Sequence, residues 1–485
     1  MTLRIASLAL LALSAAPAAL AAPATPEGAA KIAAAFQTYF GDAEGIVSVT
    51  AEGETYAVTL DAAPVFAASK GTGATGAMTP VHLTLTDLGD SKWSVEQNEP
   101  LALTLSLPEA LSLDVRSEAA TWSGTFDTDL MAFTKSQSTL SGLTVTERIT
   151  EPQGPLTNVI YKIDSLTMDT EAAASAGGGV DGKLHYIATG ISESVRVEGT
   201  GAGAAPMTFD LTAARYDVST TTKGVRTEGL YALLAWAVAH PSKEAVDADI
   251  EGLKGAVRAA LPLWNALNGT GEMTDIHVET PFGAGGIASA GFGIEMSGVI
   301  SDGHFREHVT LKGLDLPTAL MPAWVPPLVP NDLSIDIAVD GFDLAAPAAL
   351  MLDGPQEDAR LTGDQMDARM LAALLPDGKV TVTIAPGETV SPSYTLNYEG
   401  ALDAGPGRMP EGSVTVIAKG LDAALEALNA APEDVRSGAV PAIMMLRGIA
   451  KPAGVGGFSW QIDMSQDGKV LVNGLDLSAL AGGMK

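Results

Sequence analysis

The sequence predicts an α+β protein in which antiparallel strands dominate. Segments that alternate apolar and polar residues recur along most of the chain, for example 101–107, 195–198 and 380–384. This period of two is typical of strands with one face covered and the other in water. Short stretches with helical periodicity interrupt them, and aromatic residues make up only 5% of the chain. We therefore expect extended or curved sheets, with short helices on one face or at strand ends, rather than a compact sandwich.

The N-terminus has the order of a cleavable secretory signal peptide. Arg4 supplies a positive start, residues 5–13 are apolar, and Ala19-Leu20-Ala21 matches the small-x-small cleavage pattern. The apolar stretch is too short to cross a bilayer, which takes about 20 residues. We expect residues 1–21 to be removed after Ala21 and the protein to be exported to the periplasm.

Residues 22–226 are expected to form an N-terminal β-rich region. A helix over residues 26–40 comes first, because Ile32, Phe36 and Phe40 form one apolar stripe. From residue 45 the period changes to two, and alternating segments separated by turn-rich breaks continue to about residue 225. This pattern predicts an antiparallel sheet system with long loops.

Residues 227–485 are expected to form a C-terminal α+β region. Residues 230–239 are apolar on all sides, which predicts a buried helix. A second helix is expected over residues 244–267, with a kink at Pro262. Strands return from about residue 273.

A Gly–apolar–Asp motif recurs where strand-like runs end. The glycine permits a tight bend off the strand, and the aspartate can cap the N-terminus of a short helix that follows. We therefore expect a bend and a capped helix at each copy: Gly313-Leu314-Asp315, Gly341-Phe342-Asp343, Gly420-Leu421-Asp422 and Gly474-Leu475-Asp476.

Two of these motifs close larger segments that resemble each other. Both segments open with a helix after Gly-Leu, carry a proline in a second helix (Pro262 and Pro441) and end in a hairpin through Asp-Gly. They span residues 229–320 and 420–481. An internal duplication explains this similarity, and chance matching in a chain rich in Ala, Leu and Gly is the alternative.

Composition excludes several classes of function. The formal net charge is −30, so the surface repels phosphate backbones and we expect no nucleic-acid partner. The sequence contains no cysteine, which excludes disulfides, thiolate metal ligands and a lipid-anchoring cysteine.

Three patterns match known sites in part. His304, Glu307 and His308 have the order of an inverted zinc-protease motif, but in the strand expected here the histidines would lie roughly 13 Å apart. Gly71–Gly76 has dinucleotide-site spacing but opens no helix. Asp247–Gly252 matches half of a calcium loop, with Arg258 where a bidentate Glu is required. We therefore assign no catalytic, cofactor-binding or metal site.

The C-terminal hairpin that closes on residues 467–477, together with the signal peptide and alternating strands, resembles an exported alphaproteobacterial family known only as a domain of unknown function. The recurring pattern of a strand followed by Gly-Leu-Asp-Leu is more distantly similar to the sequences of AsmA-like envelope proteins. The second resemblance implies a role in outer-membrane lipid homeostasis. Neither family supplies catalytic residues.

Three functions are compatible with the sequence. The leading hypothesis is a non-enzymatic periplasmic envelope protein that binds an apolar ligand, such as a lipid, or a partner protein, since no catalytic constellation is present and a curved sheet offers an apolar groove. A hydrolase with dispersed active-site residues is the second. The third is a structural or assembly factor that pairs through exposed strand edges.

Overall fold

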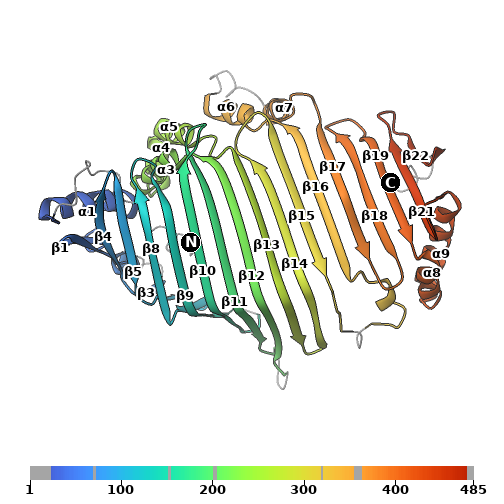
Figure 1. The fold of residues 1–485 in the computed structure, drawn as a ribbon, viewed down its shortest axis with the longest axis horizontal. Helices are drawn as coiled ribbons and strands as arrows, with labels where there is room; N and C mark the ends of the chain where they lie inside the picture. Colours follow the sequence, from blue (N-terminus) through green and yellow to red (C-terminus); the bar gives the residue numbers. More distant parts are fainter. Residues whose placement is uncertain are drawn as a thin grey trace. The chain divides into compact units, whose positions relative to one another are not determined.

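The computed structural model describes residues 23–68, 73–150, 154–199, 205–317, 321–353 and 363–477. The expected signal peptide with its cleavage site after Ala21, and the first two residues of Gly71–Gly76, lie outside these ranges. The chain divides into two compact units, Met1–Ala266 and Leu267–Lys485, so the helices between residues 227 and 260, which we expected in the C-terminal region, belong to the first unit. Both units consist mainly of antiparallel strands with short helices (Figure 1), which confirms the predicted α+β fold class.

In the first unit, the sheet divides at β9 (Ala132–Ile149). One side of β9 pairs with β10 (Thr157–Ala174). On the other side, β8 (Ala119–Asp127) pairs with the first part of β9 and β7 (Leu111–Arg116) with the last part. Two branches therefore leave β9. The β8 branch continues to β5 (Lys92–Asn98), β4 (Val81–Gly89), β2 (Thr55–Leu60) and β1 (Val47–Glu52). The β7 branch continues to β6 (Ala102–Leu107) and β3 (Thr75–Met78), and β3 packs against α2 (Ala63–Ala68).

Helix α1 (Pro26–Phe40) closes the main hydrophobic core on the β8 branch. The helix begins after Thr25, whose Oγ1 accepts a hydrogen bond from the first turn. Ile32 and Phe36 are buried and Phe40 packs against the same core, so the predicted helix and its apolar stripe are confirmed. The sheet contributes the fully buried side chains of Val58, Leu85 and Phe126.

The longest strands of the first unit share one interruption. Strands β9, β10, β11 (Val180–Val197) and β12 (Met207–Val225) pair in chain order, and every pairing is antiparallel, as the sequence predicts for residues 45–225. Regular pairing breaks at a single row across the four strands, formed by Gly142, Asp164, Gly190 and Ala214. On β10 most apolar residues hold odd positions before this row, ending with Ile163, and even positions after it, starting with Leu166; the exception before the row, Ile160, is exposed. We call these four residues the glycine row, after Gly142 and Gly190. The row marks the point where the apolar residues of these strands change from one set of alternate positions to the other.

The helices after β12 differ from the prediction. In α3 (Thr227–Ala239) only Gly229 is buried, so the prediction of a buried helix is wrong. Helix α3 packs mainly on α5 and α1, which leaves its other sides partly exposed.

The expected helix over residues 244–267 is also wrong, because two helices stand there, α4 (Lys243–Ala248) and α5 (Ile250–Ala260). Asp249 separates them, since its carboxylate accepts a hydrogen bond from the N–H of Gly252 at 3.1 Å and caps α5. Pro262 lies beyond the end of α5 and therefore kinks no helix. A proline lacks the N–H that a further helical turn needs and would clash with the preceding turn, so the helix ends before it.

In the second unit the strands follow one another in chain order (Figure 1). Each strand from β14 to β19 pairs antiparallel with the next, and β21 pairs with β19. The bounds are β13 (Ala266–Thr280), β14 (Gly283–Ser297), β15 (Gly303–Lys312), β16 (Asp332–Phe342), β17 (Val380–Val390), β18 (Thr395–Ala404), β19 (Glu411–Lys419), β20 (Lys451–Pro452), β21 (Gly457–Met464), β22 (Val470–Val472) and β23 (Leu475–Asp476).

The helices of the second unit lie at the margins of its strands. The main contacts of α6 (Ala345–Asp353) and α7 (Gly363–Leu374) are with each other, near strand ends, and the short η4 (Pro326–Leu328) contacts α8. Helices α8 (Leu421–Asn429) and α9 (Glu433–Gly448) lie beside β21 over a small core built on Ala418, Trp460 and Val472. Among the described residues, no helix packs extensively on β14–β18.

The Gly–apolar–Asp motif is confirmed in its glycines and only partly in its aspartates. Asp343 caps α6, since its Oδ1 accepts from the N–H of Ala346 at 2.8 Å. The helix prediction is wrong at Asp315, which forms a β-bridge with Gly286. Asp476 ends the short strand β23, and the helix expected after it lies outside the described residues. Asp422 lies in the first turn of α8 and pairs with Arg447 instead of capping. The bends have left-handed φ values of +63°, +87°, +77° and +88° at Gly313, Gly341, Gly420 and Gly474.

The expected duplicated segments contain different sets of elements. Residues 229–320 include helices α3–α5 and the long strands β13–β15, whereas residues 420–481 include α8, α9 and short strands. Pro441 lies inside α9 as predicted, but Pro262 lies outside α5. The duplication stays a prediction.

Candidate functional site

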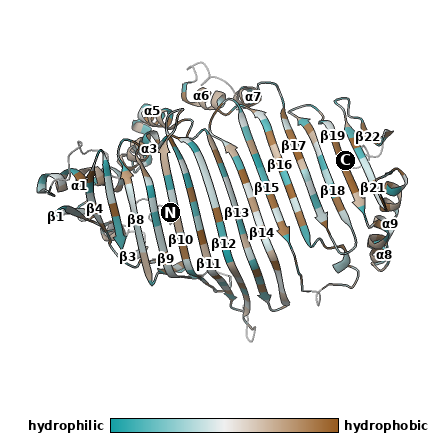
Figure 2. Ribbon diagram, in the orientation of Figure 1, coloured by the Kyte–Doolittle hydropathy of each residue, from teal (hydrophilic) through white to brown (hydrophobic). Residues whose placement is uncertain are grey.

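Strands β14–β19 and β21 form a sheet with two chemically different faces. Directly opposed residues share a face, and successive residues along a strand alternate between faces. On β15, His304 and Arg306 therefore lie on one face, opposite Asp340 of β16 and Glu295 of β14 respectively. We call this the polar face, and the opposite one, which carries the intervening residues such as Phe305, the apolar face. Figure 2 shows the resulting alternation of hydrophilic and hydrophobic residues along these strands.

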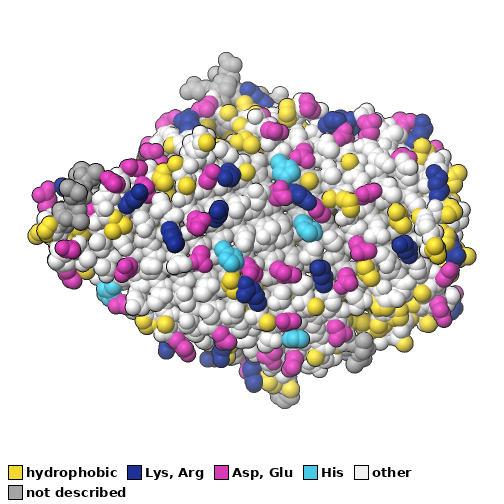
Figure 3. Space-filling model, viewed as in Figure 1, with side chains coloured by type: hydrophobic (Ala, Val, Ile, Leu, Met, Phe, Trp, Pro, Cys, Tyr) yellow, Lys and Arg dark blue, Asp and Glu magenta, His cyan; other side chains and the backbone are white. Residues whose placement is uncertain are grey.

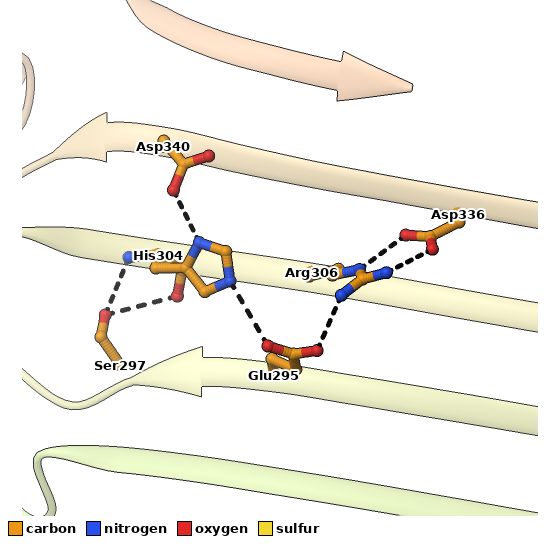
Figure 4. Close-up of polar contacts among 6 residues, drawn as sticks. All are labelled: Glu295, Ser297, His304, Arg306, Asp336 and Asp340. Atoms are coloured by element: carbon orange, nitrogen blue, oxygen red, sulfur yellow. Dashed lines mark hydrogen bonds and ion pairs between the residues drawn. The ribbon is translucent and has the colours of Figure 1, made fainter. Parts of the chain in front are cut away.

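The polar face carries a connected network at β14–β16 (Figure 4). His304 is central to it: its Nδ1 lies 2.6 Å from a carboxylate oxygen of Asp340, and its Nε2 lies 3.9 Å from Glu295. The Oγ of Ser297 accepts a hydrogen bond from the backbone N–H of His304 at 3.0 Å. The serine therefore fixes the main chain and does not contact the imidazole.

Arg306 completes the network. Its guanidinium donates two hydrogen bonds to Asp336, at 2.8 and 2.6 Å, and one to Glu295 at 3.0 Å. Asp336 is buried, and the Arg306 guanidinium lowers its pKa while burial acts in the opposite direction. The same pairing raises the pKa of Arg306, so both groups are charged over the whole physiological range. This two-pronged ion pair fixes β15 against β16.

The three residues of the His-x-x-Glu-His segment do not come together in one site. The segment lies in strand β15, as the sequence predicts. His304 contacts Asp340, whereas His308 lies 3.4 Å from the hydroxyl of Ser334, and Glu307 belongs to the apolar face. Within the described part of the chain, no group of three or more His, Asp or Glu side chains is arranged to hold a metal ion.

The other two sequence patterns serve local structure. Asp247 pairs with Lys243 within α4, and Asp249 caps α5 and accepts a hydrogen bond from the indole of Trp236 at 3.0 Å. The segment that matches half of a calcium loop therefore spans the end of α4, the capping Asp249 and the start of α5. Gly76 lies in strand β3.

Two shallow hollows of about 430 Å³ lie on polar surfaces, one in each unit. The hollow in the second unit is lined by Glu388, Asn397 and Glu399 on the polar face. The hollow in the first unit is lined by ion pairs, with Lys183 3.4 Å from Glu171 and Lys223 2.9 Å from Asp181. Sequence reasoning did not identify either, because each collects residues from strands far apart in the chain.

The apolar face continues across the whole sheet and is open at its centre. Phe292 of β14 lies directly opposite Val309 of β15, and Ile337 of β16 lies opposite Glu307, one diagonal step from Val309. These three apolar side chains are 40%, 36% and 38% exposed, respectively. Within the described residues, a small core and the adjoining helices cover this face near β21. The alternating pattern of these strands predicted an apolar face, but it did not predict that the centre would be left uncovered. Acidic, basic and histidine side chains are spread over the surface seen in Figure 3.

Comparisons with protein-family models, curated protein sequences and solved structures gave no match for this chain. Of the helices in the described ranges, none combines the length and apolar character needed to cross a membrane.

Proposed function

We propose that this protein binds an apolar ligand, such as a lipid, on the apolar face of β14–β19 and β21, in a non-enzymatic role at the cell envelope. The observation that carries the proposal is the exposure of Phe292, Val309 and Ile337 on the same face of three neighbouring strands. Contiguous exposed apolar surface of this kind marks binding sites in folded proteins. The expected signal peptide supports a periplasmic setting.

The asymmetry of the two faces supports the same conclusion. The polar face is held by ion pairs such as Arg306 with Asp336 and needs no cover. The apolar face exposes side chains whose transfer out of water gains about 25 cal/mol per Å² of apolar area. The apolar part of a ligand lying over Phe292, Val309 and Ile337 would remove this area from water without changing the fold.

Substitution on each face tests the proposal. Ile337→Asn places a polar group on the apolar face, and the neighbouring Ala338→Asn places the same group on the polar face as a matched control. We expect Ile337→Asn to weaken binding of the uncharged, environment-sensitive dye Nile red about tenfold, since it removes apolar contact area and adds an amide that loses water when the dye covers it. Ala338→Asn should leave the affinity unchanged.

Equal dye binding by both variants and the unmodified protein would contradict a site on this face. Organic extraction of protein purified from its native periplasm, followed by mass spectrometry, provides a second test. A lipid recovered in reproducible stoichiometry supports the proposal, and a ligand-free protein that also fails to take up Nile red overturns it.

A further inference from the structure

Glu307 is placed unlike the other charged residues of its sheet. It lies opposite Ile294 on one side and Ile337 on the other, so its side chain projects from the apolar face. Its neighbours along that face of β15 are Phe305 and Val309. By register, the remaining Asp, Glu, Lys and Arg residues of β14–β19 and β21 all belong to the polar face: Glu295, Arg306, Lys312, Asp332, Asp336, Asp340, Glu388, Glu399, Asp403, Glu411, Lys419 and Asp463.

No charge within the described part of the chain neutralises this carboxylate. Glu307 is exposed and forms no ion pair or hydrogen bond with another described side chain. Arg306, its neighbour in the chain, points to the opposite face and is occupied by Asp336 and Glu295. While the apolar face is open to water, solvation keeps the carboxylate charged at little cost.

A ligand that covers the apolar face would remove the water that solvates the Glu307 carboxylate. A hydrocarbon laid over Ile294, Ile337 and Val309 would strip water from Glu307, and an unpaired carboxylate in apolar surroundings is strongly unfavourable. A purely hydrocarbon ligand therefore fits poorly at this point. A ligand with an anionic head group fits worse, since Glu307 and the net charge of −30 both repel it.

Resting on the proposed function, we infer that the ligand of this face is an amphiphile that carries a protonated amine, and that Glu307 binds this ammonium group. The ammonium replaces the lost water with charge-assisted hydrogen bonds to the carboxylate. The hydrocarbon part lies over Phe292, Val309 and Ile337, the exposed residues around Glu307. Charge complementarity thus selects the class of ligand, and the apolar neighbours supply most of the contact area.

Matched alkyl probes test this inference on the full chain in about 150 mM salt, where long-range attraction to the acidic surface is screened beyond roughly 8 Å. The probes are dodecylammonium, uncharged dodecyl maltoside and dodecanoate, each below its micelle concentration, with affinities from titration calorimetry. We expect dodecylammonium to bind about tenfold more tightly than dodecyl maltoside, and dodecanoate to bind least. The Glu307→Gln variant should lose the preference for the ammonium while retaining dodecyl maltoside binding.

Glu399→Gln is the control, because it removes the same charge from the polar face of β18. It should keep the preference for dodecylammonium. A preference that survives Glu307→Gln, or that falls equally in Glu399→Gln, overturns the assignment to Glu307. Glu307→Gln that only increases aggregation, with selectivity unchanged, also overturns it and makes this carboxylate a guard against edge and face association.

The outcomes separate this inference from the proposed function. Dodecyl maltoside bound without any preference for the ammonium leaves the apolar site in place and rejects only the role of Glu307. Failure of the uncharged and the cationic probe to bind the unmodified protein rejects both.

Discussion

At the scale of single residues, adjacent positions in a strand have opposite environments. Arg306 sits in a closed network with Asp336 and Glu295, whereas Glu307 projects from the other face with apolar neighbours. The sequence shows both charges side by side, and only the strand geometry separates them. The His-x-x-Glu-His order is thereby divided between two faces of one sheet.

Ion pairs on the polar surface also control the titration of individual carboxylates. Lys223 and the backbone N–H of Gly224 hydrogen-bond to Asp181 and lower its pKa to about 2, from an ordinary value of 3.8. We expect Lys223→Ala to raise this pKa toward the ordinary value, as measured by carbon NMR of the carboxyl group during a pH titration. Asp467, which Lys469 also holds at a pKa of about 2, serves as the internal control and should not shift.

The sign of the effect on stability follows from that depressed pKa. Because Asp181 binds its proton more weakly in the folded than in the unfolded chain, the pairing stabilises the fold above pH 4 and is lost as the pH falls toward 2. A pKa of Asp181 that is the same with and without Lys223 would show that the backbone hydrogen bond alone sets it.

At the scale of elements, the glycine row in β9–β12 is the feature with the clearest cost of substitution. Gly190 has φ +63°, and a Cβ there would collide with the carboxylate of Asp164. We expect Gly190→Ala to lower the free energy of unfolding by about 1–3 kcal/mol, measured by urea denaturation. Gly255→Ala, in helix α5 with open space around it, is the control and should be neutral or stabilising by up to about 1 kcal/mol. A neutral Gly190→Ala would mean that the row tolerates regular strand geometry.

Elements also show where periodicity is informative and where it is not. Helix α1 follows its apolar stripe from end to end, because the stripe and the cap lie within a few residues of each other. The apolar stripe over residues 244–267 continues through Asp249, so periodicity could not reveal that this side chain ends one helix and caps the next. The aspartates of the Gly–apolar–Asp motif differ for a similar reason. Their glycine bends are local, but whether a helix or a strand follows depends on the neighbouring elements.

At the scale of the whole molecule, burial decides how much two side chains of the same type contribute to stability. Phe36 is 2% exposed in the core under α1, whereas Phe292 is 40% exposed on the apolar face. Phe36→Ala should lower the free energy of unfolding of its unit by about 3–5 kcal/mol. Phe292→Ala should cost about 1 kcal/mol, since water already reaches much of its ring. Denaturant unfolding followed by circular dichroism measures both, and an equal loss at Phe292 would show that the apolar face is a covered core.

The sequence by itself determined the α+β class, the strand alternation, helix α1 and the four left-handed bends, because each depends on residues close together in the chain. Only the tertiary structure decided that the sheet divides at β9, that Arg306 meets Asp336, and that Glu307 lies between apolar neighbours on the opposite face. These features depend on which strands pair and in which register. Pairing joins residues far apart in the sequence, and a shift of one position would move every side chain to the other face.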